Sequence, residues 1–131
     1  MSLEPLAVLV VDDNRIIRDM VARAVAMSGL PTAKVDQAAD GRQALFMLGA
    51  GAYHLVMLDI NMPLMNGEQL LTAMRAEPRY AGMMVVVVST ESSPARIARL
   101  RALGAEFIHK PFRPEELVAA VQRLVAGRIP T

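Results

Sequence analysis

The chain has 131 residues, 53% of them hydrophobic, and carries 14 basic and 13 acidic side chains for a net charge of +1. A chain of this length predicts one domain with its own core, and the lack of cysteine excludes disulfides, thiolate metal sites and cysteine nucleophiles. Because the charge is balanced and no apolar run approaches the roughly 18 residues that span a bilayer, we expect a cytoplasmic protein with no direct nucleic-acid contact and no membrane segment.

The hydrophobic pattern predicts five strands that alternate with five helices. In chain order the expected elements are strand 6–11, helix 14–27, strand 32–37, helix 40–48, strand 55–60, helix 68–75, strand 84–89, helix 93–103, strand 106–109 and helix 114–126. The first strand is a continuous apolar run, as in a parallel strand that helices cover on both faces. The second is more polar and is expected at an edge. This alternation implies right-handed βαβ units and a parallel sheet between two helix layers.

Several helix boundaries carry recognisable signals. Gly29 is expected to end the first helix in the left-handed conformation. Asp40 can cap the second helix, with Gln43 reaching back three residues as in a capping box. Ser93 followed by Pro94 is a favourable start for the fourth helix. The first helix carries two apolar rows with four-residue spacing, one of Ile16, Met20 and Ala24 and one of Ile17, Val21 and Val25.

Polar residues follow four of the expected strands at their carboxyl ends. They are Asp12 and Asp13 after the first strand, Asp59 at the third, Ser89 and Thr90 at the fourth, and Lys110 after the fifth. In a parallel sheet these ends share one edge, and ligands bind there, where the strand order reverses. The sequence therefore predicts a site that combines carboxylates, hydroxyls and an amine.

Three carboxylates that converge repel one another, by about 4 kcal/mol for two charges ~4 Å apart at an effective dielectric constant near 20. We therefore expect raised pKa values or a bound cation, and carboxylate and carbonyl oxygens favour Mg²⁺. Lys110 can add positive charge through a salt bridge to Asp59 or to an anion bound beside it. A metal, an aspartate, a hydroxyl and a lysine together suit phosphoryl transfer, with Asp59 as the nucleophile and Ser89 hydrogen-bonding a phosphoryl oxygen.

The carboxylates and the lysine also have ordinary structural interpretations. Either Asp12 or Asp13 can cap the first helix. Asp59 can simply form a turn, and Lys110 can be a surface lysine. Their common location favours the chemical interpretation. The residues interpreted as having no role in the site are His54, His109, Arg96, Arg99 and Arg101, the three arginines as a solvated face.

Six motifs resemble those of the receiver domains of two-component response regulators. In chain order they are Val11-Asp12-Asp13-Asn14, Asp40-Gly41-Arg42-Gln43-Ala44-Leu45, residues 58–67, Val88-Ser89-Thr90-Glu91, Gly104-Ala105 and Lys110-Pro111-Phe112. Each motif is weak alone, but six in this order and spacing are highly specific. The chain is similar to such a domain from about residue 6 to 124, which implies a single, chemotaxis-regulator-like receiver domain over 1–131 with its core at about 6–126.

The resemblance implies an α/β, flavodoxin-like fold, with a doubly wound parallel sheet of five strands in the order 2-1-3-4-5 and five helices. It implies that Asp59 is the phosphoacceptor for a histidine kinase or a phosphotransfer protein. It also implies a Mg²⁺ site formed by Asp13, Asp59 and the backbone carbonyl of Asn61, with Asp12 acting through water.

The resemblance implies roles for residues beyond the acidic cluster. Ser89 and Lys110 would contact the phosphoryl group, and Phe107 occupies the family's aromatic switch position. The Lys110–Pro111 bond is expected to be cis, as is usual in the family. Thr90 stands where a small residue is usual, which makes Thr90 an alternative to Ser89 as the hydroxyl that contacts phosphate.

Three functions follow as hypotheses. The first is a signalling switch rather than an enzyme: phosphorylation of Asp59 biases the loop after the fourth strand and Phe107, and changes how a partner binds the face of the fourth helix, fifth strand and fifth helix. The second is an interaction module of the same fold that works without phosphorylation. The third, a phosphatase with an aspartyl nucleophile, is disfavoured because Asn61 stands where a second acid is usual. The chain can be a single-domain regulator or a receiver domain of a longer protein.

Overall fold

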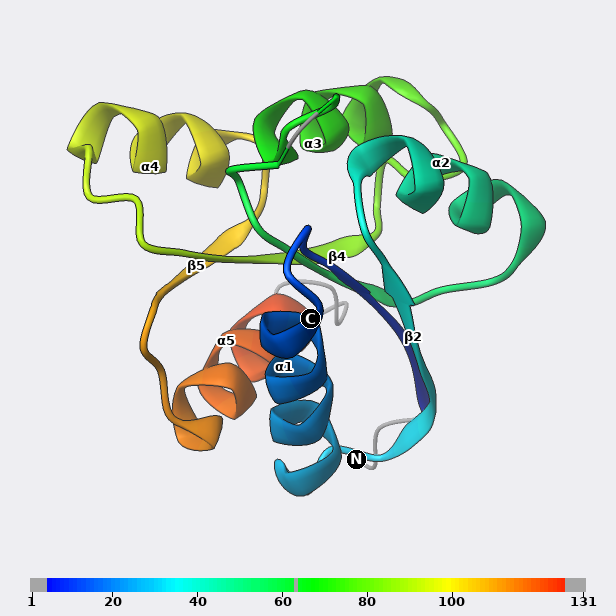
Figure 1. The fold of residues 1–131 in the computed structure, drawn as a ribbon, viewed down its shortest axis with the longest axis vertical. Coiled ribbons are helices and arrows are strands. Elements are labelled where there is room, and N and C mark those ends of the chain that lie inside the picture. The colour runs from blue at the N-terminus through cyan, green and yellow to red at the C-terminus, as the bar shows by residue number, and fades with distance from the viewer. Residues whose placement is uncertain (1–4, 63, 127–131) are drawn as a thin grey trace.

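The computed structural model describes residues 5–62 and 64–126 and is drawn in Figure 1. Over these residues five strands and five helices alternate, as the hydrophobic pattern predicts. In chain order they are β1 (Leu6–Val11), α1 (Arg15–Met27), β2 (Thr32–Ala38), α2 (Gly41–Ala50), β3 (Leu55–Leu58), α3 (Gly67–Ala76), β4 (Met84–Ser89), α4 (Pro94–Ala102), β5 (Glu106–His109) and α5 (Pro114–Ala126). None of these helices has the length and apolar character that crossing a membrane requires.

The strands form one parallel sheet in the order β2-β1-β3-β4-β5. This is the expected flavodoxin-like order, in which the chain winds first toward one edge of the sheet and then toward the other. Figure 1 shows α1 and α5 on one face of the sheet and α2, α3 and α4 on the other. The predicted parallel sheet between two helix layers is confirmed.

The sheet carries an apolar core on each face, because alternate residues of a strand point to opposite faces. Every residue of β1, β3 and β4 is buried, whereas the edge strand β2 is only partly buried, as its polar composition predicts. In β1, Leu9 and Val11 pack under α2, α3 and α4, and Val8 and Val10 pack under α1 and α5. Burial of each such side chain contributes about 1.5–3 kcal/mol, so the central strand ends are firmly held.

The start of α2 differs from the expected capping box. The Asp40 side chain accepts a hydrogen bond from the N–H of Gln43 at 2.8 Å, as predicted, but the Gln43 side chain accepts from the N–H of Ala39 at 2.7 Å. The second half of the prediction is therefore wrong by one residue. A complete capping box lies instead at α3, where the side chains of Asn66 and Gln69 accept from each other's backbone N–H.

Helix α1 packs on the sheet through one of its two apolar rows. Val21 and Val25 are buried, but Ile16 and Met20 are 71% and 58% exposed. A helix on a sheet buries only one stripe, so the second apolar row remains at the surface. Gly29, with a φ of 84°, follows the helix in the left-handed conformation that the sequence predicts.

Candidate functional site

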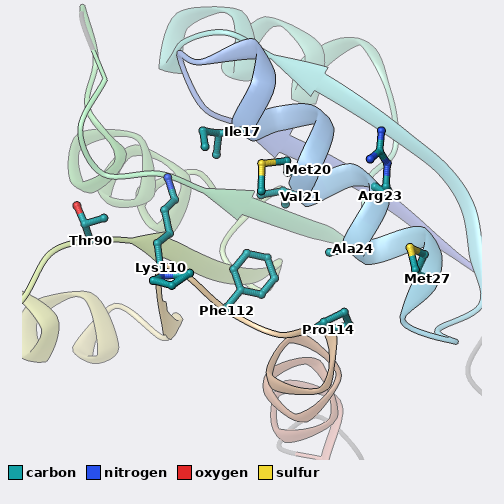
Figure 2. Close-up of a pocket in the computed structure, with 11 residues that line it drawn as sticks. Ile17, Met20, Val21, Arg23, Ala24, Met27, Thr90, Lys110, Phe112 and Pro114 are labelled. Atoms are coloured by element: carbon teal, nitrogen blue, oxygen red, sulfur yellow. The ribbon is translucent and has the colours of Figure 1, made fainter.

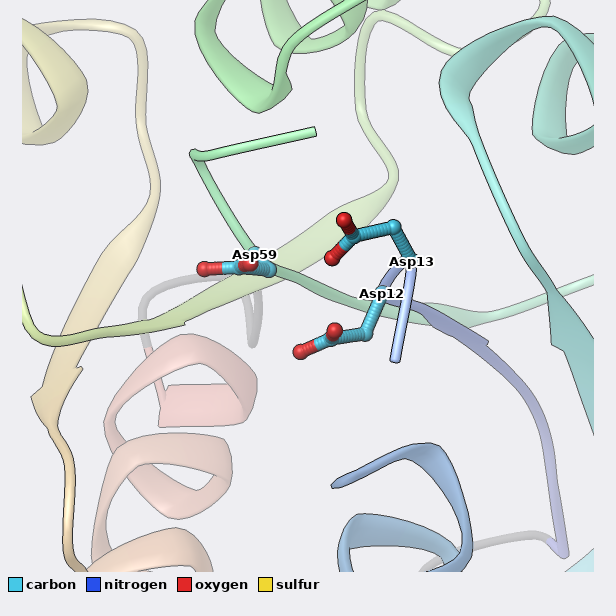
Figure 3. A group of neighbouring side chains, drawn as sticks. All are labelled: Asp12, Asp13 and Asp59. Atoms are coloured by element: carbon cyan, nitrogen blue, oxygen red, sulfur yellow. The ribbon is translucent and has the colours of Figure 1, made fainter. Parts of the chain in front are cut away.

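The polar residues that follow the strands meet at one edge of the sheet, as the parallel topology predicts. Asp12 and Asp13 lie directly after β1, and Asp59 lies directly after β3. Strands β1 and β3 are neighbours, with Val11 opposite Leu58, which places the three aspartates side by side. Figure 3 shows their side chains projecting from two chain segments toward a common region.

The three carboxylates form an acidic cluster. Each offers an oxygen atom, and these oxygens all lie within 4.8 Å of one another. Asp12 and Asp59 are 4% and 9% exposed, whereas Asp13 faces solvent. Oxygen donors with this spacing, open to water on one side, suit a hard cation that keeps part of its hydration shell, such as Mg²⁺. The fold therefore brings together the three aspartates predicted to bind the metal. The role of the Asn61 carbonyl as a metal ligand stays a prediction.

Lys110 reaches the same cluster from the segment after β5. Its Nζ lies 3.1 Å from a carboxylate oxygen of Asp12 and 3.7 Å from one of Asp59. The lysine side chain is only 20% exposed, so water screens these pairs weakly. The sequence predicts the salt bridge to Asp59 but not the shorter one to Asp12. The Lys110–Pro111 peptide bond is cis, as expected.

Burial raises the pKa of the Asp59 carboxyl above its ordinary value, because the charged form loses contact with water. The nearby charge of Asp12 raises this pKa further. Lys110 and the backbone N–H groups of Ile60 and Asn61 lower it, since they stabilise the carboxylate. The Ile60 N–H donates to Oδ1 at 2.9 Å. Together these effects leave the pKa of Asp59 raised, so the cluster can accept additional positive charge.

The turn after β3 fixes the backbone that carries Asp59. Strand β3 ends at Leu58, two residues earlier than predicted, and the Ile60 carbonyl accepts a hydrogen bond from the N–H of Gly67 at 2.9 Å. A Cβ at Gly67 would collide with the carbonyl oxygen of Asp59, so α3 can begin here only because this residue is glycine. In the same turn Leu64 has a φ of 68°, which a residue with a side chain rarely adopts.

Ser89 and Thr90 are adjacent but lie in different surroundings. Ser89 is fully buried, and its hydroxyl oxygen accepts a hydrogen bond from the N–H of Glu91 at 3.1 Å. Its carbonyl accepts from the N–H of Lys110 at 2.9 Å, which ties the end of β4 to the segment after β5. Thr90 is exposed. Because this hydrogen bond fixes the Ser89 hydroxyl, Ser89 is favoured over Thr90 as the residue that contacts phosphate. The choice between the two stays a prediction.

Phe107 lies in the short strand β5. It is partly buried and packs against the core beneath α2, α3 and α4. Its ring centroid lies 6.4 Å from that of His109, with the ring planes inclined by 53°. Phe107 is thus close to the strand end that leads to Lys110, and its role as a switch stays a prediction.

Two residues beside the cluster have contacts that the sequence interpretation missed. Asn14, rather than Asp12 or Asp13, caps α1 and accepts from the N–H of Ile16. Arg18 donates from Nη1 to the backbone carbonyl of Asp12 at 2.8 Å. The available signal was spacing, because Arg18 lies one helical turn after the cap and can reach back to the strand end.

A mainly apolar groove of about 550 Å³ lies between α1 and the segment after β5 (Figure 2). Ile17, Met20 and Met27 line it from α1, and Phe112 and Pro114 line it from the opposite side. Thr90 and Lys110 also line the groove, so it is continuous with the edge that carries the acidic cluster. The sequence did not predict this groove, because the two apolar rows of α1 do not show which of them the sheet covers.

Comparison with known proteins points to one family. The family model described as the response regulator receiver domain matches residues 8–122. A probable chemotaxis protein CheY of Rhizobium etli is 31% identical over 120 residues, which cover 91% of this chain and 92% of that protein. The response regulator MprA of Mycolicibacterium vanbaalenii is 31% identical over 126 residues, which cover 96% of this chain and 53% of MprA.

Solved structures show the same similarity. The chemotaxis response regulator CheY4 of Vibrio cholerae has a TM-score of 0.80 and 34% sequence identity, over 92% of this chain and 99% of that one. The chain spans about half the length of several curated relatives that it matches, MprA among them, and nearly all of the two chemotaxis proteins.

Proposed function

The chain belongs to the response regulator receiver domain family, and we propose that it is a phosphoacceptor of a two-component phosphorelay. Domains of this family are signalling switches. In the proposal this single receiver domain is cytoplasmic, and Asp59 takes a phosphoryl group from a histidine kinase or a phosphotransfer protein. The observation that carries the proposal is the cluster of three carboxylates within 4.8 Å, with a lysine ammonium 3.1 and 3.7 Å from two of them.

The donor atoms of the cluster suit Mg²⁺. In the proposal Asp13, Asp59 and the backbone carbonyl of Asn61 hold the ion, and Asp12 acts through water. When bound, the ion supplies positive charge to the oxygens of the transferred phosphoryl group. The raised pKa of Asp59 supports this assignment, because a cation would offset both the lost hydration and the repulsion from Asp12.

Asp59 is the nucleophile of the proposed reaction. One of its carboxylate oxygens forms a bond to phosphorus while the bond from phosphorus to the donor's histidine nitrogen breaks, and the electron pair of that bond stays with the nitrogen. Lys110 lies 3.7 Å from Asp59 and is positioned to pair with a phosphoryl oxygen. The Ser89 hydroxyl, with Thr90 as the alternative, would donate a hydrogen bond to another phosphoryl oxygen.

The phosphodonor would dock on the groove beside α1. The donor's histidine has to reach Asp59 from the open edge of the sheet, so the surface around that edge must contact the donor. Met20 and Met27 are 58% and 71% exposed and line the groove. Flexible apolar side chains of this kind suit an amphipathic helix.

The phosphoryl group on Asp59 would carry a charge of about −1.5 to −2, by analogy with other phosphorylated side chains, in place of the single negative charge of the carboxylate. New contacts to Lys110 and Ser89 would bias the segment after β4 and Phe107 toward a second arrangement. The face formed by α4, β5 and α5 would then bind its output partner differently.

Labelling with a small phosphodonor tests the proposal. Incubation with Mg²⁺ should add one acid-stable, base-labile phosphoryl group at Asp59, located by mass spectrometry of peptides. Asp59→Ala should abolish it, and Asp19→Ala, an exposed carboxylate on α1, should not. Equal labelling of Asp59→Ala, or none of the wild type with any donor, would exclude the proposal. Labelling that leaves partner binding unchanged would favour an interaction module that works without phosphorylation.

A further inference from the structure

Arg96, on α4, lies between two carboxylates that belong to different segments. Its Nη1 lies 3.2 Å from Oε2 of Glu91, and its Nε lies 3.4 Å from Oε1 of Glu68. The side chains of Arg96, Glu68 and Glu91 are 26%, 29% and 18% exposed. Pairs that are mostly shielded from water are screened less than ordinary surface pairs. The solvated face expected for this arginine is therefore wrong.

Glu91 organises the loop between β4 and α4. Its backbone N–H donates to the hydroxyl oxygen of Ser89 at 3.1 Å, and its Oε1 accepts from the N–H of Ser93, the residue that caps α4, at 3.0 Å. Both carboxylate oxygens of Glu91 are thus engaged, one by the loop itself and one by Arg96. A change at Arg96 therefore acts directly on the side chain that shapes the loop beside Ser89.

Glu68 belongs to an element that is fixed relative to Asp59. It is the second residue of α3, whose first residue, Gly67, packs directly against the carbonyl of Asp59. The N–H of Gly67 also bonds to the carbonyl of Ile60. Through Glu68, Arg96 attaches the loop after β4 to the part of the chain that carries the phosphoacceptor.

We propose that Arg96 is a positioning residue, which bridges Glu91 and Glu68 and thereby holds the Ser89 hydroxyl where phosphoryl transfer to Asp59 needs it. This inference rests on the proposed function. A guanidinium suits the task because its nitrogens point in different directions and can serve two carboxylates at once, whereas an ammonium is a single point charge. The Nε–H of Arg96 is buried and not aligned with an acceptor, so the bridge depends on charge rather than on ideal hydrogen-bond geometry.

Arg99 provides a matched control. Its Nη2 lies 3.4 Å from the same oxygen of Glu68, but the structure gives Arg99 no pair with Glu91 among the described residues. With saturating Mg²⁺ and a small phosphodonor, Arg96→Ala should label Asp59 at least about fivefold more slowly than wild type, because a misplacement of about 1 Å can cost about 100-fold in rate. Arg99→Ala should stay within about twofold, and Arg96→Lys should fall between.

A double-mutant cycle separates positioning from general stabilisation. If Arg96 acts through Ser89, Arg96→Ala should add no further loss of rate in a Ser89→Ala background. The same loss in both backgrounds would overturn the proposal, as would an unaltered rate in Arg96→Ala or in Ser89→Ala. Should Arg96→Ala fail to fold, Glu91→Gln removes the same pair, keeps an oxygen for Ser93 and should show the same loss. Failure to label the wild-type chain would overturn the proposed function as well, whereas normal labelling with no effect at Arg96 would overturn this inference alone.

Discussion

Replacement of Asp59 by asparagine should make the folded chain more stable at neutral pH, although it removes the proposed phosphoacceptor. Asp59 is 9% exposed and shares its surroundings with the carboxylates of Asp12 and Asp13. Asparagine has nearly the same shape but no charge, so the substitution removes both the lost hydration of the carboxylate and its repulsion by its neighbours.

The magnitude follows from the distances. Two carboxylate charges at the 4.8 Å upper limit of the cluster repel by about 0.9 kcal/mol in water and about 3.5 kcal/mol at an effective dielectric constant near 20. Lys110, at 3.7 Å, attracts Asp59 by about 1.1 to 4.5 kcal/mol on the same basis. Attraction by Lys110 therefore offsets repulsion by Asp12, and the exposed Asp13 adds little because water screens it, so the lost hydration of the buried carboxylate dominates. We expect a gain of about 1–3 kcal/mol in the free energy of unfolding, or about 3–10 °C in the unfolding midpoint.

The effect should depend on pH with a definite sign. Burial raises the folded-state pKa of Asp59, so its destabilising contribution is fully present above that pKa and absent below the unfolded-state value near 3.9. The advantage of Asp59→Asn should be largest at neutral pH and disappear below about pH 4. Thermal unfolding in the presence of a chelator, at several pH values, measures both the gain and its pH dependence.

Asp19→Asn is the control, because Asp19 is half exposed and pairs with the exposed Arg15 at 4.0 Å. It should change the free energy of unfolding by less than about 0.5 kcal/mol. Added Mg²⁺ should narrow the gap between wild type and Asp59→Asn, since the variant has lost a metal ligand. A lower stability of Asp59→Asn at neutral pH without Mg²⁺, with Asp19→Asn unchanged, would refute the reasoning.

Three further substitutions test the structure around the cluster by urea unfolding. Lys110→Ala should lower the free energy of unfolding by about 1–3 kcal/mol at neutral pH, because the carboxylates lose the cation that pairs with them. Added Mg²⁺ should restore most of the lost stability. A loss of stability that Mg²⁺ leaves unchanged would contradict the assigned cause. Gly67→Ala should lower the free energy of unfolding by about 1–3 kcal/mol, because the Cβ of the introduced alanine meets the Asp59 carbonyl. A variant as stable as the wild type would mean that α3 can begin at another residue. Leu64→Gly should raise the free energy of unfolding by up to about 1 kcal/mol, because Leu64 has a φ of 68° and is 73% exposed. A decrease in that variant would show that the leucine side chain stabilises the turn.

The fold could be predicted because the central strands are covered on both faces. A run such as 84–88 leaves no polar side to a strand, so it indicates burial between helix layers without any knowledge of the partners. The aspartates could be predicted to meet because topology alone brings the ends of parallel strands to one edge. The end of β3 could not be predicted in this way: the strand stops at Leu58, and two residues later the Ile60 carbonyl accepts from Gly67 of α3 rather than from a strand.

Side-chain contacts between elements could not be predicted in the same way, because they depend on how each helix is rotated on the sheet. Arg18 and Arg96 are charged residues of amphipathic helices, which suggests solvent, yet one donates to the Asp12 carbonyl and the other bridges two glutamates. His54 was interpreted as incidental, but its Nδ1 accepts a hydrogen bond from the N–H of Ala7 at 2.9 Å and so links β1 to the start of β3. None of these contacts leaves a periodic signal in the sequence.

The cluster differs from the core in how substitutions should affect it. In the core, Leu58 is fully buried, and Leu58→Ala should lose about 2–5 kcal/mol of stability, with labelling of Asp59 lost as the fold weakens. At the cluster the two effects should separate, since Asp59→Asn removes labelling while it raises stability. Loss of labelling together with a gain of stability is expected only if the buried charge of Asp59 serves the reaction at the expense of the fold. Replacement of a purely structural aspartate would lower the stability instead. The two variants measured together therefore distinguish a functional Asp59 from a structural one without reference to any partner.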